Sequence, residues 1–478
     1  MYDKFGLFIN GEWRRARDGA SAAVLSPVTE QALGEVPMAT TADTEEAIAT
    51  AALGFAAWRA KQAFERADAL HAVADEMIRR RPEAARMISL ETGKPIAQSE
   101  REWTLSIDQF RWFAEEARRI YGRVIESRVP NGRFDVSHEP VGVAAEFTAW
   151  NFPAALIARK VAPALAAGCA TIVRPSSQTP GVAMVMIDCI RAGKLPNGAV
   201  SLVIGATAST YLPIMASPVV RKVSLTGSTR VGQQMIRDAA QTLKKVSMEL
   251  GGNAPLIVYD DADLELALNV SVPTKFANAG QVCVTPDRFF VHESIHDAFV
   301  RGFVERTAAL KLGDGLDPAT QMGPLINAGR MAEIEAIVDD ALTHGARVAC
   351  GGQRVSGFAQ GHFYAPTVLT DVTDDMRAFE QENFGPIAAI TRFGSDDEAL
   401  TRANASDMGL SAYAFTSSPK RARRTVAELK AGMVGINSFA LAASEAPFGG
   451  TKYSGMGREG GSEGIADYLD TKLAQIVF

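Results

Sequence analysis

The sequence predicts an α/β fold that contains two sheets of mainly parallel strands. Three observations support this prediction. Residues 43–120 are rich in Ala, Glu and Arg with a helical period, residues 141–252 alternate short apolar runs with helical stretches, and the alternation restarts after Gly251-Gly252. Alternating strands and helices are typical of βαβ units, in which helices join parallel strands. We therefore expect two α/β units.

The stretch from residue 43 to residue 120 is expected to form helices. Apolar residues such as Ala69, Val73 and Met77 recur there at intervals near 3.6, the period of an α-helix. Pro82 marks a point where one helix ends or another begins, because proline lacks the N–H that a helix interior needs.

Seven short apolar or β-branched runs predict the strands of the two units. The first four are Val141–Phe147, Ala170–Arg174, Val200–Ile204 and Val223–Thr226, and the other three are Leu256–Tyr259, Arg288–Val291 and Ile387–Ile390. Helices are expected between the later strands, at 293–311 and 330–344. The first alternation predicts a Rossmann-type sheet, which commonly binds a nucleotide.

Composition and charge limit the function classes. The 478 residues are 47% apolar and 22% charged with a net charge of −6, which is typical of a globular protein and offers no basic surface to nucleic acid. The chain shows neither a secretory signal nor an apolar run of the roughly 18 residues that a membrane helix needs. Four scattered cysteines with no C-x-x-C pair indicate no metal site and favour a reducing cytoplasm.

One thiol and one carboxyl stand in glycine-flanked segments. Cys283 ends the run F-A-N-A-G-Q-V-C, and Glu249 precedes Leu250-Gly251-Gly252. A thiolate attacks carbonyl carbon, and a carboxyl in a partly apolar site can accept a proton from water. A lone Cys is most often buried packing, and a lone Glu after a strand is most often a surface carboxylate. The pair, however, matches the two halves of a covalent acyl mechanism.

A glycine-containing turn joins a predicted strand to a predicted helix. Gly227-Ser228-Thr229-Arg230-Val231-Gly232 follows the strand Val223–Thr226 and precedes a helix expected from Gln233 to Leu243. In this context the amides at a helix N-terminus can hold a pyrophosphate, although a Gly pair alone is not specific.

Together with Trp150-Asn151-Phe152-Pro153, these segments resemble the signature of the NAD(P)-dependent aldehyde dehydrogenase superfamily. The resemblance extends over nearly the whole chain and is closest to the succinate-semialdehyde dehydrogenase-like branch. It implies that an aldehyde is oxidised to the carboxylic acid with NAD(P)+. The Cys283 thiolate would form a thiohemiacetal and then a thioester, which water activated by Glu249 would hydrolyse.

The resemblance also implies roles for further residues. Asn151 and the backbone N–H of Cys283 would form an oxyanion hole, and Lys160 and Glu459 would help to relay the proton from Glu249. Asn151 could instead cap a helix, and Lys160 and Glu459 could each belong to a surface ion pair. The expected cofactor-binding residues are Trp150, Arg174, Ser177, Gly205, Gly227, Ser228, Gly232, Glu382 and Phe384, and Arg159 is the expected substrate-binding residue.

Two departures from the family pattern bear on specificity. NAD-specific members commonly carry Lys-Pro-x-Glu where this chain has Arg174-Pro175-Ser176-Ser177, so Ser177 lacks the charge that would repel a 2′-phosphate. Arg174 could bind that phosphate or a bare ribose hydroxyl, and we expect NADP or NAD with NADP favoured. Ala277 and Ala443 replace an Arg and a Ser that hold the carboxylate of succinic semialdehyde in relatives. That substrate is therefore doubtful, although a semialdehyde remains a candidate.

Domain boundaries follow from the predicted elements and the resemblance. A cofactor-binding domain is expected at 1–122 and 141–252, a catalytic domain at 253–455, and a small β oligomerisation segment at 123–140 and 456–478. The polar, β-leaning segment Arg123–Pro140 and the tail Asp467–Phe478 could pair as strands whose exposed edges meet another subunit. The family implies a homodimer or homotetramer.

Three other functions remain open at this point. A coenzyme-A-acylating relative would pass the thioester to a thiol, a Cys hydrolase would use no dinucleotide, and a binding protein on the same fold would be inactive. The H-E-x-x-H sequence at 292–296 is not expected to bind zinc, because Ser294 resembles a helix N-cap and the first His then belongs to a strand.

Overall fold

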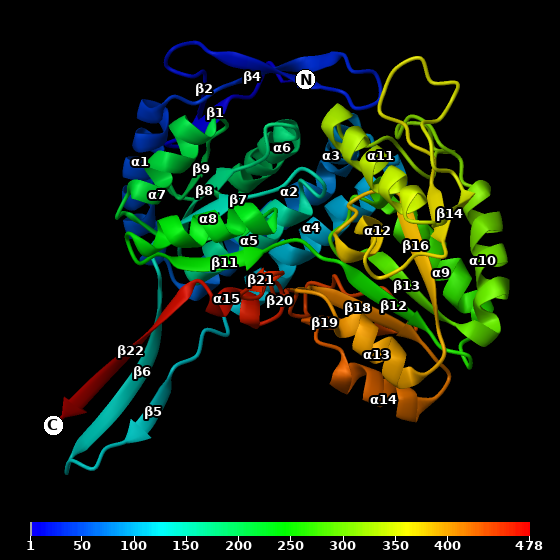
Figure 1. Ribbon diagram of the computed structural model, residues 1–478. Coiled ribbons are helices and arrows are strands. Elements are labelled where there is room, and N and C mark those ends of the chain that lie inside the picture. Colours follow the sequence, from blue (N-terminus) through cyan, green and yellow to red (C-terminus); the bar gives the residue numbers. More distant parts are fainter. Residues whose placement is uncertain (1) are drawn as a thin grey trace.

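The computed structural model describes residues 2–478, and its two large sheets lie side by side (Figure 1). The first sheet has, in spatial order, β2 (Glu12–Arg14), β1 (Leu7–Ile9), β9 (Val200–Leu202), β8 (Ala170–Arg174), β7 (Val143–Phe147), β10 (Val220–Thr226), β11 (Lys245–Glu249) and β21 (Gly455–Met456). The five strands from β9 to β11 are parallel, and the flanking strands are antiparallel. The α/β prediction is confirmed.

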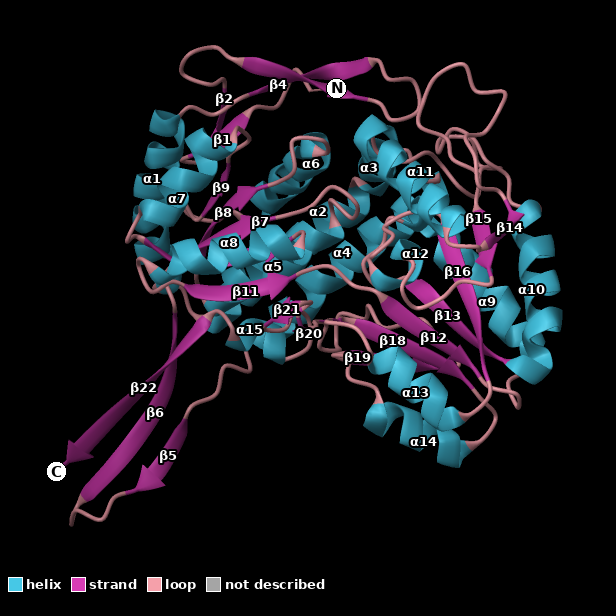
Figure 2. Cartoon of the chain, in the orientation of Figure 1, coloured by secondary structure: helices cyan, strands magenta, loops and turns pink. Residues whose placement is uncertain are grey.

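Helices pack around this sheet (Figure 2). They are α1 (Thr41–Arg59), α2 (Ala63–Arg79), α3 (Arg81–Thr92), α4 (Ile96–Ala117), α5 (Ala155–Ala167), α6 (Pro180–Ile190), α7 (Leu212–Ala216) and α8 (Thr229–Ala240). Every residue of α5 is buried, because its sequence is Ala-rich and apolar on all sides. Two charged residues, Arg159 and Lys160, nevertheless lie on this helix. Buried charges of this kind point to a function.

The second sheet is built in the same way. Its strands, in spatial order, are β14 (Arg347–Cys350), β15 (Thr367–Thr370), β16 (Ile387–Phe393), β13 (Pro286–His292), β12 (Ala254–Val258), β18 (Ser411–Phe415) and β19 (Met433–Ile436). All neighbours pair in parallel except β14 with β15. The accompanying helices are α9 (Leu264–Phe276), α10 (Glu293–Ala308), α11 (Ala328–Thr343), α12 (Arg377–Glu380), α13 (Asp396–Asn404) and α14 (Pro419–Glu428).

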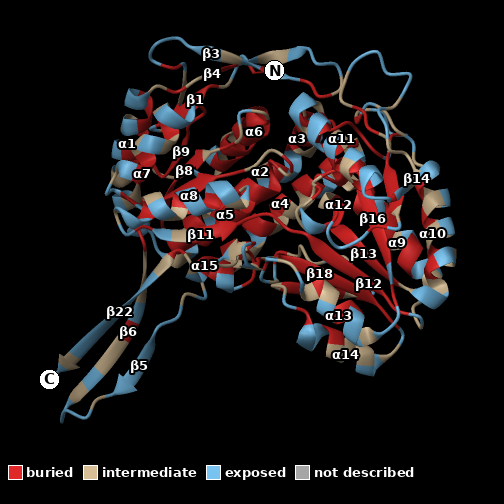
Figure 3. Cartoon of the chain, in the orientation of Figure 1, coloured by how far each residue is buried: buried red, intermediate tan, exposed pale blue. Residues whose placement is uncertain are grey.

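A three-stranded sheet protrudes from the rest of the molecule (Figure 1). In it β6 (Gly132–Pro140) lies between β5 (Arg123–Glu126) and β22 (Leu469–Val477), both antiparallel to it. Figure 3 shows buried strands in the two large sheets and largely exposed strands in this arm. Small two-stranded sheets are formed by β3 (Ser21–Leu25) with β4 (Ala32–Pro37) and by β17 (Met408–Gly409) with β20 (Thr451–Lys452), and α15 (Glu463–Ala466) precedes β22.

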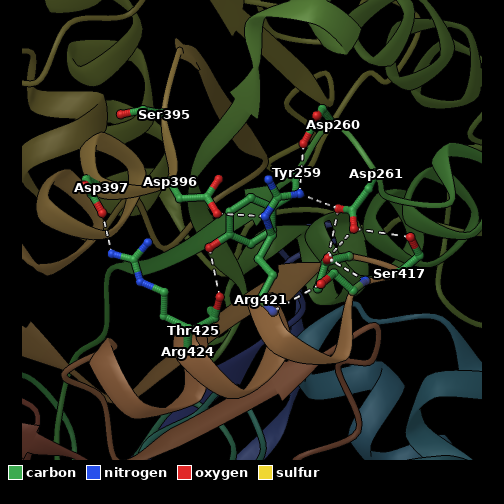
Figure 4. A network of polar contacts seen from close by, with 12 residues as sticks. Tyr259, Asp260, Asp261, Ser395, Asp396, Asp397, Ser417, Arg421, Arg424 and Thr425 are labelled. Carbon is green, nitrogen blue, oxygen red and sulfur yellow. Dashed lines mark hydrogen bonds and ion pairs between the residues drawn. The ribbon is translucent and has the colours of Figure 1, made fainter.

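A network of ion pairs fixes α14 and α13 against the ends of the second sheet (Figure 4). Arg421 on α14 contacts Asp260, Asp261 and Asp396 at 2.8–2.9 Å, and its guanidinium lies 4.6 Å from the centre of the Tyr259 ring. Helix α14 precedes β19 in the chain, and the loop that follows β19 forms one wall of the candidate active site described below.

The helix α8 begins earlier than expected, and α10 begins at the expected residue but has a different N-cap. α8 starts at Thr229, because the Ser228 hydroxyl accepts a hydrogen bond from the N–H of Val231 and caps the helix. α10 starts at Glu293, and its N-cap is His292, whose Nδ1 accepts from the N–H of Ser294. The expectation that Ser294 caps this helix is therefore wrong.

His292 does end a strand, as expected, so it is separate from the helical face that carries His296. Residues 2–478 contain no group of His, Cys, Asp and Glu side chains that could hold a metal ion. Within the same residues, no helix is both long and apolar enough to cross a membrane.

Candidate active site

The carboxyl ends of the five parallel strands meet at one edge of the first sheet. Predicted site residues stand at the end of each of these strands. Arg174 and Glu249 are the last residues of β8 and β11, and Trp150-Asn151, Gly205 and Gly227 follow β7, β9 and β10. Ligands of α/β sheets bind outside these strand ends. The sheet topology therefore gathers the predicted residues along one edge.

Glu249 is buried at this edge, and neither carboxylate oxygen has a hydrogen-bond partner among residues 2–478. A Cβ added to Gly449 would lie 2.7 Å from Oε1 of Glu249, so only glycine lets the backbone approach this carboxyl so closely. Burial raises the pKa of Glu249 well above its ordinary value, the nearby Glu459 raises it further, and Lys160 opposes both. This carboxyl therefore binds a proton more readily than an exposed Glu does.

A buried ion pair stands behind Glu249. The Lys160 ammonium on α5 donates to the carboxylate of Glu459 and, at 2.9 Å, to the hydroxyl of Ser224 on β10. The second oxygen of Glu459 has no partner among the described side chains and backbone. These two residues therefore form a buried pair, and not surface ion pairs.

Cys283 follows a left-handed turn. Asn278, Ala279 and Gly280 have φ values of 48°, 54° and 72°, a conformation that costs energy for a residue other than glycine. The chain after the thiol is tied to β18, since the carbonyl of Val284 accepts from the Tyr413 hydroxyl at 2.7 Å. These contacts fix the direction in which the thiol can point.

The Cys283 thiol is partly exposed and faces an apolar wall formed by Leu410, Met433 and Phe448. Burial raises the pKa of Cys283 to about 12, Glu382 and Glu249 raise it as well, and Arg159 lowers it. The thiol is therefore protonated at neutral pH in the protein alone.

Gly251-Gly252 joins the two halves of the site. A Cβ on Gly252 would lie 2.2 Å from the carbonyl oxygen of Cys283, and a Cβ on Gly251 would lie 2.6 Å from Oε2 of Glu382. The N–H of Gly252 donates to Oε1 of Glu382 at 2.9 Å. Burial raises the pKa of Glu382 to about 8, and the N–H of Gly252 opposes this rise. The Glu249 strand and the Cys283 turn thus meet at two glycines.

Asn151 bridges the two units through both its backbone and its side chain. Its Nδ2 donates to the carbonyl of Gln281 at 3.1 Å, in the turn that leads to Cys283. An amide nitrogen carries two hydrogens, so one donor remains available. The buried Oδ1 has no partner within residues 2–478.

The same edge offers polar and aromatic groups that suit a dinucleotide. Buried oxygens of Thr148, Thr226 and Asn253 have no hydrogen-bond partner in the described chain. Trp150 and Phe384 meet edge to face, with ring centroids 5.6 Å apart. Unsatisfied buried polar atoms next to a helix N-terminus fit a polar ligand, and the residues present therefore fit a nicotinamide dinucleotide.

The predicted phosphate and ribose positions lie on the neighbouring strands. Arg174 donates through Nη2 to the carbonyl of Gly205 at 3.0 Å, and Ser177 is exposed. Ser228 caps α8, so the amides of this helix N-terminus face the strand ends. Gly232 packs on Leu250, where a Cβ would lie 2.5 Å from a methyl carbon.

Arg159 lies on α5 beside the thiol. Its Nη2 donates to the carbonyl of Ala442 at 3.2 Å, and its guanidinium lies 4.0 Å from the centre of the Phe448 ring. The buried Nη1 has no partner among residues 2–478. One donor of this arginine is thus left for a ligand.

A model of the aldehyde dehydrogenase family matches residues 13–474. The chain belongs to this family. As an aldehyde dehydrogenase it oxidises an aldehyde, and its family uses NAD(P)+. The resemblance inferred from the motifs around residues 151, 249 and 283 is confirmed.

Individual relatives match this aldehyde dehydrogenase over almost its whole length. A 3-sulfolactaldehyde dehydrogenase of Pseudomonas putida is 43% identical over 465 residues, covering 97% of this chain and 95% of that protein. The NADP(+) succinate-semialdehyde dehydrogenase of Escherichia coli K12 is 42% identical, with 97% and 96% covered. The crystal structure of a succinate-semialdehyde dehydrogenase from Burkholderia pseudomallei has a TM-score of 0.97 and 41% identity, covering 99% of this chain and 98% of that one.

The sequence did not reveal every residue that shapes the site of this aldehyde dehydrogenase. Lys94 and Glu102 form a buried ion pair that contacts the Asn151 backbone, and Gln281 links the Cys283 turn to the carbonyl of Pro324 and the N–H of Ile326. The one available signal was the Gly93-Lys94-Pro95 break between two helices. Such a break predicts a boundary but not a contact.

Proposed function

We propose that this enzyme oxidises its aldehyde through a covalent adduct on Cys283 and hydrolyses the resulting thioester with Glu249 as general base. The observation that carries the proposal is the meeting of the two residues at Gly251-Gly252, with both oxygens of Glu249 unpartnered. Aldehyde, NAD(P)+ and enzyme should yield carboxylic acid and NAD(P)H in equal amounts. Acyl-CoA formed after addition of coenzyme A would contradict hydrolysis.

Different side chains act in the addition to the aldehyde and in the hydrolysis of the thioester. The Cys283 thiol releases its proton to solvent, and the thiolate sulfur adds to the carbonyl carbon while the free N–H of Asn151 and the backbone N–H of Cys283 stabilise the oxygen that becomes negative. After the thioester has formed, Glu249 takes a proton from water, and the oxygen of that water replaces the sulfur on the acyl carbon. The sulfur leaves as a thiolate and takes up a proton from solvent, and Lys160 with Glu459 offers the proton on Glu249 a route away.

A nicotinamide dinucleotide supplies the acceptor for the hydride that leaves the aldehyde carbon. We propose that Trp150, Glu382 and Phe384 hold its nicotinamide end. The phosphates would lie at Gly205, Gly227, Ser228 and Gly232, and the adenosine ribose at Arg174 and Ser177. The unpartnered polar atoms along the strand ends support this assignment.

NADP is the cofactor that we expect to be preferred. Ser177 is exposed and uncharged, and Arg174 keeps donors free beyond its bonds to the Thr210 hydroxyl and the Gly205 carbonyl. The Ser177→Glu variant should lose roughly tenfold in kcat/KM for NADP relative to NAD, because a carboxylate would repel the 2′-phosphate. Steady-state kinetics with both cofactors measure this ratio. Ser177→Gln, which has similar size without charge, should change the ratio far less, and equal ratios in both variants would contradict the assignment.

The substrate that the site supports best is a small aldehyde with an anionic group. Nη1 of Arg159 has no partner among residues 2–478, and its guanidinium lies over Phe448, a member of the apolar cluster against which Cys283 packs. The substrates in the names of two relatives, 3-sulfolactaldehyde and succinate semialdehyde, both carry an anionic group. Because Ala277 and Ala443 offer no polar side chain, we propose that Arg159 is the main contact for that anion.

Replacement of Arg159 by Met tests this proposal. The variant should lower kcat/KM for anionic aldehydes about 10- to 100-fold, the range expected for a lost charge-assisted hydrogen bond. Propanal, a neutral substrate of similar size, serves as the control, and its kcat/KM should change less than about threefold. Equal losses for charged and neutral aldehydes would show that Arg159 acts on the reaction centre instead.

We also propose that the enzyme is a homodimer or homotetramer assembled through the protruding sheet. Both outer strands of this sheet are unpaired along one edge, and they expose Val124, Leu473 and Val477 at 69%, 63% and 56%. Light scattering should give two or four times the chain mass of 51.0 kDa. The double variant Val124→Lys, Leu473→Lys should shift that mass downward, whereas a monomeric wild-type protein would contradict the proposal.

A further inference from the structure

Lys94 is a fully buried lysine that lies outside the predicted site. It occupies the break between α3 and α4, and its ammonium donates to Oε2 of Glu102 at 2.6 Å and to the carbonyl oxygen of Asn151 at 2.8 Å. The same nitrogen lies 3.9 Å from the centre of the Phe152 ring. The hydrogen bonds and the ring contact of its ammonium are therefore directed to Glu102 and to the turn that carries Asn151.

Glu102 extends this contact to helix α5. Its Oε1 accepts from the N–H of Ala154 at 2.8 Å and from the N–H of Ala155 at 3.3 Å. No side chain of α5 itself caps this end, so the carboxylate from α4 satisfies amides that would otherwise be unpaired. The pair thus fixes the two ends of a short segment, from Asn151 to the start of α5.

The carbonyl of Asn151 also ties this segment to the Cys283 turn. It accepts a second hydrogen bond from Nδ2 of Asn278 at 3.1 Å, and the N–H of Asn278 donates to Oε1 of Gln98 at 2.9 Å. Asn278 has left-handed backbone angles, which persist only when the surroundings determine them. One carbonyl oxygen therefore connects Lys94, the oxyanion-hole amide and the strained turn before the nucleophile.

A buried ion pair is a costly way to gain stability. Removal of two charges from water offsets most of their attraction, and an apolar pair of similar volume is often as stable or more stable. What the ion pair provides in addition is direction, because its hydrogen bonds have defined geometry. This geometry points to a positional role.

We propose that Lys94 and Glu102 are positioning residues that hold the Asn151 amide at the distance from Cys283 that addition to a carbonyl requires. The inference rests on the proposed function of Cys283 and Asn151. Neither residue of the pair touches the reacting atoms. They act on the oxyanion hole, and the nucleophilicity of the sulfur does not depend on them.

Two reactions of the same thiol separate this role from general support of the fold. Addition to an aldehyde needs the oxyanion hole, whereas alkylation by iodoacetamide develops no oxyanion. In Lys94→Met, the rate of the first-turnover NAD(P)H burst should fall about 100-fold, close to the fall in Asn151→Ala. Alkylation of Cys283 should stay within about twofold of the wild-type rate.

The control is Arg80→Met, which removes a buried arginine of the first unit that is paired with two partly exposed carboxylates. Arg80 contacts Glu83 and Asp188 at 2.8 and 2.7 Å, away from the site, so its loss should lower the melting temperature without changing either rate. Glu102→Gln keeps an acceptor for Ala154 but removes the charge next to Lys94. It should reproduce the selective loss, about tenfold, and decides the question if Lys94→Met does not fold.

A burst that stays within threefold of the wild-type rate in a folded variant would overturn the proposal. So would a burst and an alkylation rate that fall together. Absence of any burst in the wild-type enzyme would instead defeat the proposed function of Cys283, so the two failures are distinguishable.

Discussion

Replacement of Cys283 by Ala is expected to abolish aldehyde oxidation, lowering kcat by roughly 10⁴-fold or more. The reason is that the carbonyl carbon loses the nucleophile that converts it into a hydride donor, and no neighbouring side chain can replace that nucleophile. The other three cysteines lie elsewhere: Cys169 and Cys189 are buried in the first unit, and Cys350 is on the edge strand β14. Formation of NAD(P)H at saturating aldehyde measures the loss.

Cys350→Ala is the matched control, because this thiol is also partly exposed but lies on β14. It should retain the wild-type rate. Binding of the dinucleotide to Cys283→Ala, followed by the rise in melting temperature, should persist, since the phosphate and ribose contacts do not involve the sulfur. Substantial oxidation by folded Cys283→Ala would refute a covalent mechanism, and failure of NAD(P)+ to stabilise the wild-type protein would favour a hydrolase.

Glu249→Gln should separate the two halves of the reaction. The variant should still form about one NAD(P)H per active site in a rapid burst, and its steady-state rate should then fall roughly 10²- to 10⁴-fold. Burial and Glu459 raise the pKa of Glu249, so the carboxylate is a stronger base than an exposed Glu, whereas an amide cannot accept the proton of water. Stopped-flow absorbance of NAD(P)H measures both phases.

The control for this variant is Glu305→Gln, an exposed carboxyl on α10. It should leave burst and steady state unchanged. Because no water can be activated in Glu249→Gln, the acyl group should remain on the enzyme, and intact-protein mass spectrometry should detect it. Steady turnover of Glu249→Gln at the wild-type rate would rule out Glu249 as the base.

The fold could be predicted where local pattern and neighbour packing agree. β7 and β8 are mostly apolar and almost wholly buried because helices cover them, and their apolar runs predicted their positions in the sequence. The strands β1, β2 and β21 were not anticipated as members of the first sheet, since each has only two or three residues and pairs with a distant segment. Such pairing leaves no periodic signal.

The site could be predicted where chemistry is concentrated in a motif. Cys283, Glu249 and Asn151 each stand in a run whose glycines or proline mark a turn, and the structure brings these three runs together. Lys94 and Glu102 lie about 50 residues from Asn151 in the chain. Their contact with it could not be predicted, because the sequence does not distinguish a buried lysine between two helices from an exposed one. Only the tertiary contact between α4 and α5 reveals their burial.

The terminal segment contributes to both the chemistry and the arm. Glu459, the partner of Lys160, precedes β22 by ten residues, and a backbone bridge to Phe448 fixes its position. A frameshift in the last twenty codons of the gene would leave the recognisable motifs at residues 151, 249 and 283 intact. A shift that begins at codon 459 would remove Glu459 and β22, and with them the proposed proton route and the proposed subunit contact, so motif searches alone would misjudge such an allele as functional.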